Sequence, residues 1–226
     1  MDIIKVENLS AHYENRKVFE NLNFTVCDGD YLCIIGENGS GKTTLMKTIL
    51  GMNIKHSGSV TFNSFTKNEI GWLPQKTEHQ KDFPASVKEV IMSGFAGIGF
   101  LGLIYKKGHK KEAEKNMKLL DISDIAEQSF SELSGGQQQK VLLCRALCAA
   151  KKVLLLDEPT AALDTASAEE LYSLIRKLNR NGLAVIMITH DISRAVGEAK
   201  HILSLSDGDS FFGSDAEYVE YVKGDI

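Results

Sequence analysis

Two kinds of hydrophobic pattern divide this chain, one typical of strands and one typical of helices. Apolar and polar residues alternate in two stretches of residues 2–31, which are joined by the polar residues 14–17 and predict two antiparallel strands. Unbroken apolar runs at residues 32–35, 153–156 and 183–188 predict strands that are buried on both faces. Such strands are typical of a parallel sheet that lies between helices.

The middle of the chain changes to helical spacing. From about residue 82 to residue 150, apolar residues recur every three or four positions, with Lys and Glu between them. A further amphipathic helix is predicted for residues 167–182, where Gly182 ends it. Turn-forming residues predict hairpins at residues 51–64 and 201–213.

The order of these elements predicts one α/β domain over residues 1–226. Residues 1–81 and 151–226 are expected to form its core, a parallel sheet flanked by helices with an antiparallel β layer at the N-terminus. Residues from about 82 to 150 are expected to form an inserted α-helical subdomain. A chain of 226 residues is long enough to bury such a core without disulfides or structural metals.

Composition and charge exclude several classes of protein. Hydrophobic residues make up 43% of the chain and charged residues 25%, as in an ordinary soluble globular protein. The formal net charge is −4, so no overall basic field attracts nucleic acid or anionic lipid. The basic cluster at residues 106–111 has no interleaved aromatic residues and precedes Glu112 and Glu114, so we interpret it as the solvated start of a helix.

The cysteines and the apolar segments indicate where the protein works. Four cysteines are present: Cys27, Cys33, Cys144 and Cys148. They lack Cys-x-x-Cys spacing, which favours buried thiols in a reducing cytosol over a metal site at Cys144 and Cys148. Residues 1–10 lack the features of an export signal, and residues 90–105 are too short and too rich in glycine to cross a bilayer. We therefore expect the protein to work on the cytoplasmic side.

Residues 36–43, GENGSGKT, stand between a buried apolar run and a predicted helix, which is the setting of a phosphate-binding loop. The glycines bring backbone N–H groups against phosphate oxygens at the positive end of a helix that begins near Gly41. Lys42 offers a mobile charge to the β- and γ-phosphates, and the Thr43 hydroxyl suits Mg²⁺. The predicted ATP-binding residues of this loop are Gly36, Glu37, Asn38, Gly39, Ser40, Gly41, Lys42, Thr43 and Thr44.

Three polar side chains follow buried strands and are expected at the same edge of the sheet. Asp157 and Glu158 end one apolar run, and His190 follows another. Asp157 is suited to hold Mg²⁺ directly or through water, and Glu158 can accept a proton from the water that attacks the γ-phosphorus. His190 can reach the γ-phosphate as a hydrogen-bond donor, although a histidine at a strand end is commonly structural.

A second anion-binding helix start is predicted at residues 133–140, LSGGQQQK. Ser134, Gly135 and Gly136 offer a hydroxyl and free N–H groups before an apolar helix. One nucleotide does not need two such sites. We therefore expect this one to serve a nucleotide held by another subunit, so that two chains close head-to-tail on two ATP molecules.

The motifs GENGSGKT, Gln75, LSGGQ, VLLLDEP, AALD and His190, in this order, resemble those of the ATP-binding subunits of ABC transporters over essentially the whole chain. The resemblance implies the fold of an ABC nucleotide-binding domain, with a P-loop NTPase core, and it implies ATP and Mg²⁺ as cofactors. It also implies that Tyr13 stacks on adenine, although its position alone favours a tyrosine at the solvent edge of a strand.

The resemblance assigns roles to further residues. It implies that Gln75 senses Mg²⁺, the attacking water and the transport partner, that Glu158 is the general base, and that Asp164 crosses the dimer interface. His190 becomes the γ-phosphate contact. The implied Mg²⁺ ligands are Thr43, Gln75 and Asp157, and the implied signature residues that contact ATP in trans are Leu133, Ser134, Gly135, Gly136 and Gln137.

Two positions depart from the usual pattern of the family. Lys140 stands where an arginine usually follows the signature, which keeps the charge but loses the planar guanidinium. Ala161 replaces the usual serine of the SALD motif and removes a hydroxyl near the interface. Neither change touches the residues expected to hydrolyse ATP.

The chain has no membrane span of its own, so we expect a separate permease. The expected partners are a second ATPase subunit, as a homodimer on ATP, integral membrane permease subunits and an extracytoplasmic solute-binding protein, with no nucleic acid. The chain would then lie at the cytoplasmic face of the cell membrane. The glycine-rich apolar string at residues 94–105 is expected to help form the groove that receives the permease.

Residues 81–122 are similar to the corresponding region of zinc/manganese importer ATPases, in which a Phe-Pro-x-(Ser/Thr)-Val string precedes a glycine-rich segment. An ABC ATPase for another solute, importing or exporting, is the alternative. A soluble ABC protein of DNA repair or translation would carry long coiled-coil or zinc-bearing insertions, which this sequence lacks. A small-molecule kinase would leave LSGGQ and AALD without a role.

Overall fold

The computed structural model describes residues 1–226 except 14–15, 76–83, 97–106, 207–208 and 225–226. Its described residues form two compact units, the first made of Met1–Lys67 and Asn181–Ile226 and the second of Asn68–Arg180. The strands are β1 Asp2–Tyr13, β2 Arg16–Cys27, β3 Tyr31–Gly36, β4 His56–Phe62, β5 Ile70–Leu73, β6 Val153–Asp157, β7 Ala184–Ile188, β8 His201–Ser206 and β9 Asp209–Ser214. The helices are α1 Lys42–Ile49, α2 Val87–Met92, α3 Lys107–Leu119, α4 Gly135–Ala149, α5 Thr165–Arg180, α6 Ile192–Glu198 and α7 Asp215–Lys223, with short 3-10 turns η1 Lys67–Glu69, η3 Ser93–Phe95 and η4 Phe130–Glu132.

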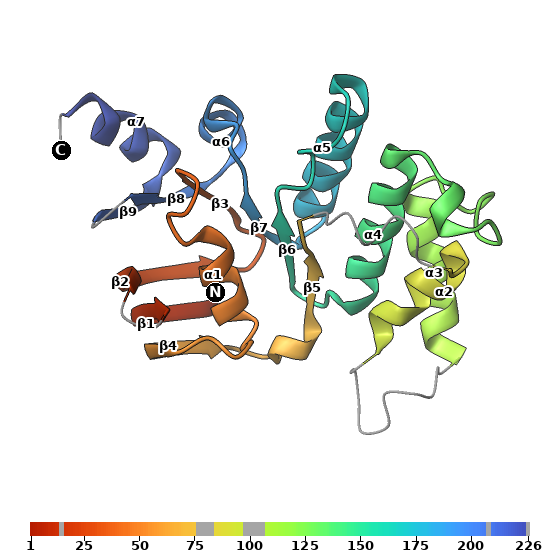
Figure 1. Ribbon diagram of the computed structural model, residues 1–226, viewed down its shortest axis with the longest axis horizontal. Coiled ribbons are helices and arrows are strands. Elements are labelled where there is room, and N and C mark those ends of the chain that lie inside the picture. The colour runs from red at the N-terminus through yellow and green to blue at the C-terminus, as the bar shows by residue number, and fades with distance from the viewer. Residues whose placement is uncertain (14–15, 76–83, 97–106, 207–208, 225–226) are drawn as a thin grey trace. The chain divides into compact units, whose positions relative to one another are not determined.

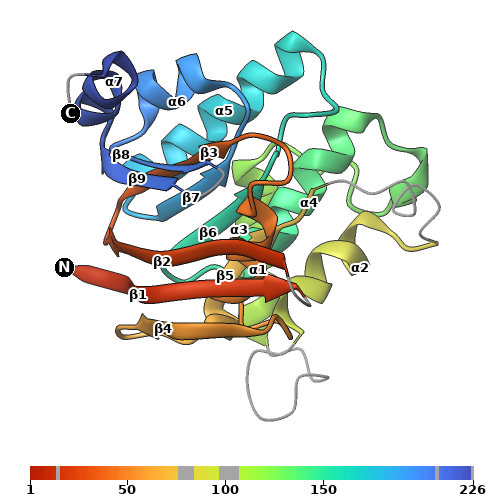
Figure 2. The same cartoon turned by 60° about the vertical axis from the view of Figure 1, so that its left-hand side comes forward.

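An antiparallel sheet forms one layer of the first unit. Its strands lie in the order β2, β1, β4 (Figure 2), so the two antiparallel strands predicted for residues 2–31 are confirmed. The hairpin predicted for residues 51–64 is wrong. That region contributes a single strand, β4, which pairs with β1 instead of folding back on itself, because β1 offers it a long partner in the register Lys5↔Thr61 and Val6↔Val60.

The second sheet of this unit positions the phosphate-binding loop. Strand β3 lies between β7 and β8 and is parallel to both, and β9 pairs antiparallel with β8. Residues 31–35 of β3 and all of β7 are buried, as their unbroken apolar runs predict. The predicted hairpin at residues 201–213 is confirmed as β8 and β9, although its turn residues 207–208 lie outside the described chain.

The amino end of β3 is fixed by a buried carboxylate. Asp30 has no exposed surface, and its oxygens lie 2.9 Å from Nδ1 of His201 at the start of β8. The same carboxylate accepts hydrogen bonds from the backbone N–H groups of Cys27 and Tyr31. The strand that carries the phosphate-binding loop is therefore held at the end opposite to that loop.

Helices dominate the second unit. Helices α2, α3 and α4 pack together beside the parallel strands β5 and β6 (Figure 1). The approach of α4 to β5 is close, because a Cβ on Gly71 would lie 2.3 Å from the carbonyl oxygen of Ala146. The helices predicted within residues 82–150 and at residues 167–182 are present as α2, α3, α4 and α5; the subdomain boundaries at 82 and 150 stay a prediction.

The last helix, α7, was not predicted. Ser214 caps it, in a capping box with Glu217, and Gly224 ends it in the left-handed conformation. Both capping signals are present in the sequence and are sufficient to predict this helix. No helix in the described part of the chain has the length and apolar character needed to cross a membrane.

Candidate functional site

The phosphate-binding loop leaves β3 at Gly36 and enters α1 at Lys42. Gly36 has φ 146, and a Cβ there would lie 2.2 Å from the carbonyl oxygen of Leu205, so only glycine fits beside β8. Gly41 is the N-cap of α1 in the left-handed conformation, with φ 98. A Cβ on Gly41 would lie 2.5 Å from Cγ1 of Val18. The loop therefore connects a buried strand to the start of a helix, as the sequence predicts, and such a helix start is a setting suited to phosphate.

The ammonium group of Lys42 lies across this loop. Its Nζ donates hydrogen bonds to the backbone carbonyls of Gly36, at 2.8 Å, and Glu37, at 2.7 Å. The residue is only 6% exposed, so the two carbonyls replace much of the water that its charge would otherwise bind. Thr43 and Thr44 are half-buried in the first turn of α1, while Glu37, Asn38 and Gly39 are exposed.

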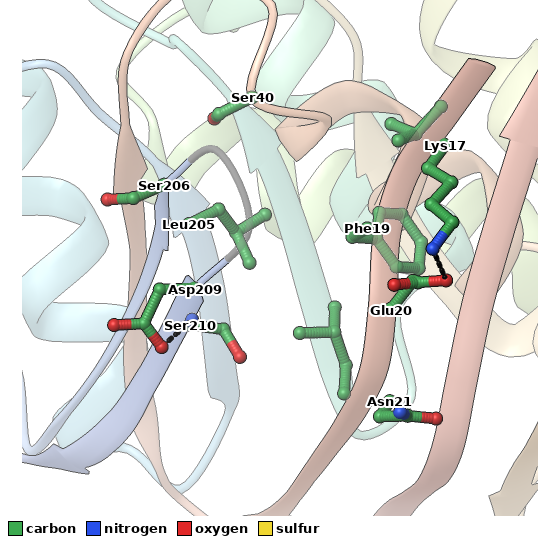
Figure 3. A pocket seen from close by; sticks show the side chains of 11 residues that line it. Lys17, Phe19, Glu20, Asn21, Ser40, Leu205, Ser206, Asp209 and Ser210 are labelled. Carbon is green, nitrogen blue, oxygen red and sulfur yellow. Dashed lines mark hydrogen bonds and ion pairs between the residues drawn. The ribbon is translucent and has the colours of Figure 1, made fainter.

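A groove of about 380 Å³ opens beside the loop within the first unit (Figure 3). Strand β2 lines one side of it, with the Lys17–Glu20 ion pair, and the ends of β8 and β9 line the other, with Asp209. Ser40 of the loop also lines it, and among the described residues the buried Oγ of Ser40 has no hydrogen-bond partner. The loop is thus accessible from the side of β2.

The sheet places His190 near the start of the phosphate-binding loop. In the parallel register of β3 and β7, Ile34 pairs with Ile188, so Gly36 and His190 each follow the pair by two residues at the same edge. The N–H of Thr189 donates to the carbonyl of Ile34 at 3.2 Å, which continues the pairing past the strand. His190 is exposed. The structure therefore brings these two predicted elements together, while the hydrogen bond of His190 to a γ-phosphate stays a prediction.

Tyr13 is the last residue of β1 and pairs with Arg16 of β2. Its side chain lies outside what the structure describes, so its stacking on adenine stays a prediction. The same holds for the greater part of the glycine-rich string, because residues 97–106 lie outside the described chain.

In the second unit, Gln75 and Glu158 follow two paired strands, and Asp157 is the last residue of one of them, β6. Leu73 of β5 pairs with Leu156 of β6, so Gln75 and Glu158 each follow the pair by two residues. Their side chains meet, because Nε2 of Gln75 donates a hydrogen bond to Oε2 of Glu158 at 2.8 Å. Asp157 is 3% exposed at the end of β6. A hydroxyl, an amide and a carboxylate are hard oxygen donors, so Thr43, Gln75 and Asp157 are chemically suited to Mg²⁺.

The signature residues form the capped start of α4. Ser134 is the N-cap; its Oγ accepts a hydrogen bond from the N–H of Gln137 at 3.3 Å, and the Gln137 side chain accepts one from the N–H of Ser134 at 3.0 Å. Ser134 and Gly135 are exposed, and Leu133 is buried beneath them. A serine hydroxyl that accepts one bond still has its own proton to donate, so the cap leaves this helix start able to bind an anion.

Asp164 lies beside the signature within the second unit. Its carboxylate accepts hydrogen bonds from the N–H groups of Ala166 and Ser167 and from Oγ of Ser167 at 2.7 Å. These bonds, those from Ser167 first, lower the pKa of Asp164. A Cβ on Gly136 would lie 3.3 Å from Oγ of Ser167, so Asp164 orients the residue that packs on the signature.

Sequence reasoning did not identify two residues that contact these motifs. Ser167 follows Asp164 by three residues, and this spacing is a capping signal that could have found it. Gln139 is buried and donates to the carbonyl of Pro159 at 2.7 Å. The sequence carries no signal for that contact, because residues 139 and 159 lie on different elements.

The two departures from the usual motif pattern lie in the second unit, where Lys140 is half-buried. Nζ of Lys140 lies 2.7 Å from Oε1 of Glu170 on α5, so the lysine forms a single-oxygen ion pair across a small cavity of about 140 Å³ beside the signature. Ala161 is exposed. The backbone N–H of Ala161 donates a hydrogen bond to the carbonyl of Glu158 at 3.3 Å.

The cysteines are free thiols. Cys33, Cys144 and Cys148 are buried, as predicted, but Cys27 is half-buried. A hydrogen bond between the thiols of Cys144 and Cys148 raises the pKa of Cys144 and lowers the pKa of Cys148. Burial raises the pKa of Cys33 to about 12. Among the described residues, no group of three or more His, Cys, Asp or Glu side chains could hold a metal ion, so Cys144 and Cys148 form no such cluster.

Comparison with known families gives one broad match. Residues 19–161 match the family model described as ABC transporter. This segment includes the phosphate-binding loop, the signature and the carboxylates that follow β6.

Individual proteins match over nearly the whole chain. The chain is 35% identical to the zinc uptake system ATP-binding protein ZurA of Listeria monocytogenes, over 97% of this chain and 89% of that protein. It is 33% identical to the manganese transport system ATP-binding protein MntB of Halalkalibacterium halodurans, over 90% of this chain and 83% of that protein. A solved structure of a metal-chelate type ABC transporter in an inward-facing conformation matches with a TM-score of 0.86 and 30% identity, over 96% of this chain and 85% of that one.

Proposed function

Since this chain belongs to the ABC transporter family, whose ATPases hydrolyse ATP to power transport, we propose that two copies of it dimerise on ATP and drive a separate membrane permease. We further propose that the cargo is a divalent metal ion such as zinc or manganese, imported into the cell. The names of the relatives ZurA and MntB and of the metal-chelate type transporter support the choice of cargo.

One observation carries the proposal of a dimer. The chain has two helix starts suited to anions, the loop before α1 and the capped start of α4, and each lies in a different unit. A single triphosphate is already satisfied by the first cradle and Lys42. The second, exposed at Ser134 and Gly135, is therefore assigned to the nucleotide of a partner copy, and the partner's signature to the nucleotide of this copy.

The residues then divide the chemistry among them. Backbone N–H groups of residues 36–43 and the ammonium of Lys42 hold the phosphates, and the partner's signature closes on the γ-phosphate. Glu158 accepts a proton from a water molecule while the oxygen of that water bonds to the γ-phosphorus. At the same time the bond from the γ-phosphorus to the β–γ bridging oxygen breaks, so the products are ADP and phosphate. His190 donates a hydrogen bond to the γ-phosphate.

Mg²⁺ is proposed as the cofactor. Thr43, Gln75 and Asp157 would hold it, and when bound it would neutralise charge on the β- and γ-phosphate oxygens. The bond from Gln75 to Glu158 orients the proposed base toward the site of the attacking water. The proposed role of Asp164 at the dimer interface is to hold Ser167 against the signature.

The remaining partners follow from the proposed role. Permease subunits would bind the chain at the cytoplasmic face of the membrane, and the glycine-rich string at residues 94–105 is proposed as part of that contact. An extracytoplasmic binding protein would deliver the metal to the permease. No nucleic acid is expected among the partners, in keeping with the net charge of −4.

The substitution Glu158→Gln tests the dimer and the base together. It removes the proton acceptor but keeps both phosphate cradles, so turnover should fall by roughly a hundredfold or more, and ATP should trap a dimer on size exclusion. Wild-type protein with ATP under hydrolysing conditions is the control. Turnover that survives the substitution contradicts the role of Glu158, and a variant that binds ATP but stays monomeric contradicts the dimer.

Metal accumulation tests the cargo. Cells without this chain should take up less zinc or manganese in metal-limited medium, and wild-type protein should restore uptake while Glu158→Gln should not. Equal uptake of both metals with and without the chain would contradict metal import, while leaving the ATPase chemistry intact.

A further inference from the structure

The backbone at Glu158 adopts a conformation that its sequence disfavours. Glu158 has φ 48, in the left-handed region where a residue with a side chain is uncommon. The next residue is Pro159, and a proline restricts the residue before it toward extended conformations. A backbone that is disfavoured in both respects persists only where surrounding contacts hold it.

Three of the hydrogen bonds in the described part of the chain hold this turn within the second unit. The N–H of Ala161 donates to the carbonyl of Glu158 at 3.3 Å, and Nε2 of Gln75 donates to its carboxylate at 2.8 Å. The third bond comes from Gln139, whose Nε2 donates to the carbonyl of Pro159 at 2.7 Å. Of the three, the bond from Gln139 joins the backbone of the turn to a separate helix, α4.

The hydrogen bond from Gln139 to Pro159 is shielded from water. Gln139 is 5% exposed, and its bond to Pro159 is buried, so water cannot replace the amide as a donor. Its neighbour Gln138 offers a comparison, since it is also 5% exposed and its Nε2 donates to the carbonyl of Phe130 at 3.1 Å. The two glutamines thus have the same chemistry and burial; Gln138 donates to the carbonyl of Phe130, whereas Gln139 donates to the turn of Glu158.

We infer that Gln139 is a positioning residue for the general base, and that through it α4 couples the two ATP sites of a dimer. Gln139 follows the N-cap Ser134 by five residues on one helix, a rise of about 7–8 Å. The helix start that would bind the partner's nucleotide and the amide that holds this copy's base therefore belong to one rigid element. This inference rests on the proposed function.

The coupling has a definite direction. A nucleotide bound in the partner pulls on the start of α4, and α4 carries that displacement to the carbonyl of Pro159 and so to the carboxylate of Glu158. Each copy would then set its own base only when its signature has engaged the partner's ATP. Loss of the Gln139 bond should lower turnover without weakening the binding of ATP, because Gln139 belongs to neither phosphate cradle.

Three variants of the full chain, each similar in size to the residue it replaces, test this role. Gln139→Met removes the donor at every pH, and Gln138→Met is the matched control that loses an equally buried bond. We expect Gln139→Met to lower kcat by roughly tenfold to a hundredfold with KM for ATP within about twofold, since small displacements of a catalytic group have effects of this size. Gln138→Met should lower the thermal midpoint as much but lower kcat far less.

The pH profile separates positioning from simple loss of stability. In Gln139→Glu the introduced carboxyl group can donate to Pro159 only when it is protonated, and burial favours that form. Its kcat relative to wild type should therefore rise as the pH falls from 8 to 6, whereas the relative kcat of Gln139→Met should stay flat. A flat profile for Gln139→Glu, or equal losses of kcat in Gln138→Met and Gln139→Met, would overturn the inference.

Glu158→Gln in the same assay distinguishes failure of this inference from failure of the proposed function. If Glu158→Gln abolishes turnover while Gln139→Met keeps wild-type kcat, the base is correct and the positioning role is wrong. If Glu158→Gln keeps wild-type turnover, the proposed role of Glu158 as the general base fails.

Discussion

The starts of α1 and α4 are both suited to bind phosphate, but they are built in different ways. The N-cap of α1 is Gly41 in the left-handed conformation, without a side chain to cap the helix. The N-cap of α4 is Ser134, which forms a full capping box with Gln137. The first site is a glycine-rich loop at a helix start that has no side-chain cap, and the second is a helix start that is capped by its own side chains.

This difference matches the two proposed tasks. A loop that holds its own nucleotide gains from backbone groups that are already arranged around the phosphates. A surface that meets a ligand only when two copies close must remain stable in the separate monomers, and the capping box of α4 provides that stability. Substitutions at the two helix starts should therefore have different consequences.

The largest effect is expected for Gly41→Ala. A Cβ would lie 2.5 Å from Cγ1 of Val18 and 3.1 Å from Cδ1 of Phe19, and φ 98 is strained for alanine. We expect a loss of about 1–3 kcal/mol in the free energy of unfolding and roughly a tenfold or greater loss of ATP affinity. Denaturant titration and calorimetry measure the two quantities. Gly108→Ala on α3, where nothing lies within 4 Å of an added Cβ, is the control. Because alanine favours a helix over glycine, the control should not lower the free energy of unfolding, and it should leave the affinity for ATP unchanged. Full ATP affinity in Gly41→Ala would contradict the role of this backbone.

A smaller effect is expected for Ser134→Ala. Loss of the cap should cost about 1 kcal/mol of stability, and it should lower turnover of the dimer without changing the affinity of the monomer for ATP. Ser214→Ala at α7 is a matched control, because Ser214 forms the same capping box with Glu217. The control should lose similar stability but keep its turnover. If both variants turn over ATP at the wild-type rate, the signature has no direct contact with a nucleotide.

The contact between Gly136 and Ser167 should have a still smaller effect. Gly136→Ala would place a Cβ 3.3 Å from Oγ of Ser167, and Ser167→Ala would relieve that contact. We expect Ser167→Ala to restore part of the turnover lost in Gly136→Ala, with a coupling of about 0.5–1 kcal/mol in a double-mutant cycle. Additive effects in the cycle would show that the two residues act independently.

The smallest expected effect concerns pH. Hydrogen bonds from Ser167 lower the pKa of Asp164, so its contribution to stability is fully present above its ordinary pKa and is lost as the pH falls through the lowered value. The thermal midpoint of Asp164→Asn should therefore lie slightly below that of the wild type at pH 6, and the difference should shrink toward pH 3. A difference that stays constant over this range would mean that the charge of Asp164 contributes nothing.

Much of the fold and of the site was predictable, because local patterns determine it. The unbroken apolar runs of β3, β6 and β7 required burial on both faces, and the glycines of residues 36–43 required a loop between a strand and a helix. Parallel pairing then placed His190 beside Gly36, and Gln75 beside Glu158, because residues that follow paired strands meet at one edge.

Contacts between distant segments were not predictable. The pairing of β4 with β1 joins residues that are about fifty positions apart, and its turn-rich sequence suits a local hairpin equally well. The bond from Gln139 to Pro159 depends on how α4 packs, and no spacing in the sequence encodes it. Ser167 differs from these, because its spacing from Asp164 is a local signal.

The arrangement of Lys42 has a consequence for selectivity among the small anions of the cell. Its ammonium group is already solvated by the carbonyls of Gly36 and Glu37, at 2.8 and 2.7 Å. Chloride or acetate carries a single charge and must lose its own hydration to approach Lys42. Its attraction to an ammonium group that two carbonyls already solvate does not offset that loss. A polyphosphate chain also engages the backbone N–H groups of the loop, so the cradle should discriminate against ordinary salt without any steric filter.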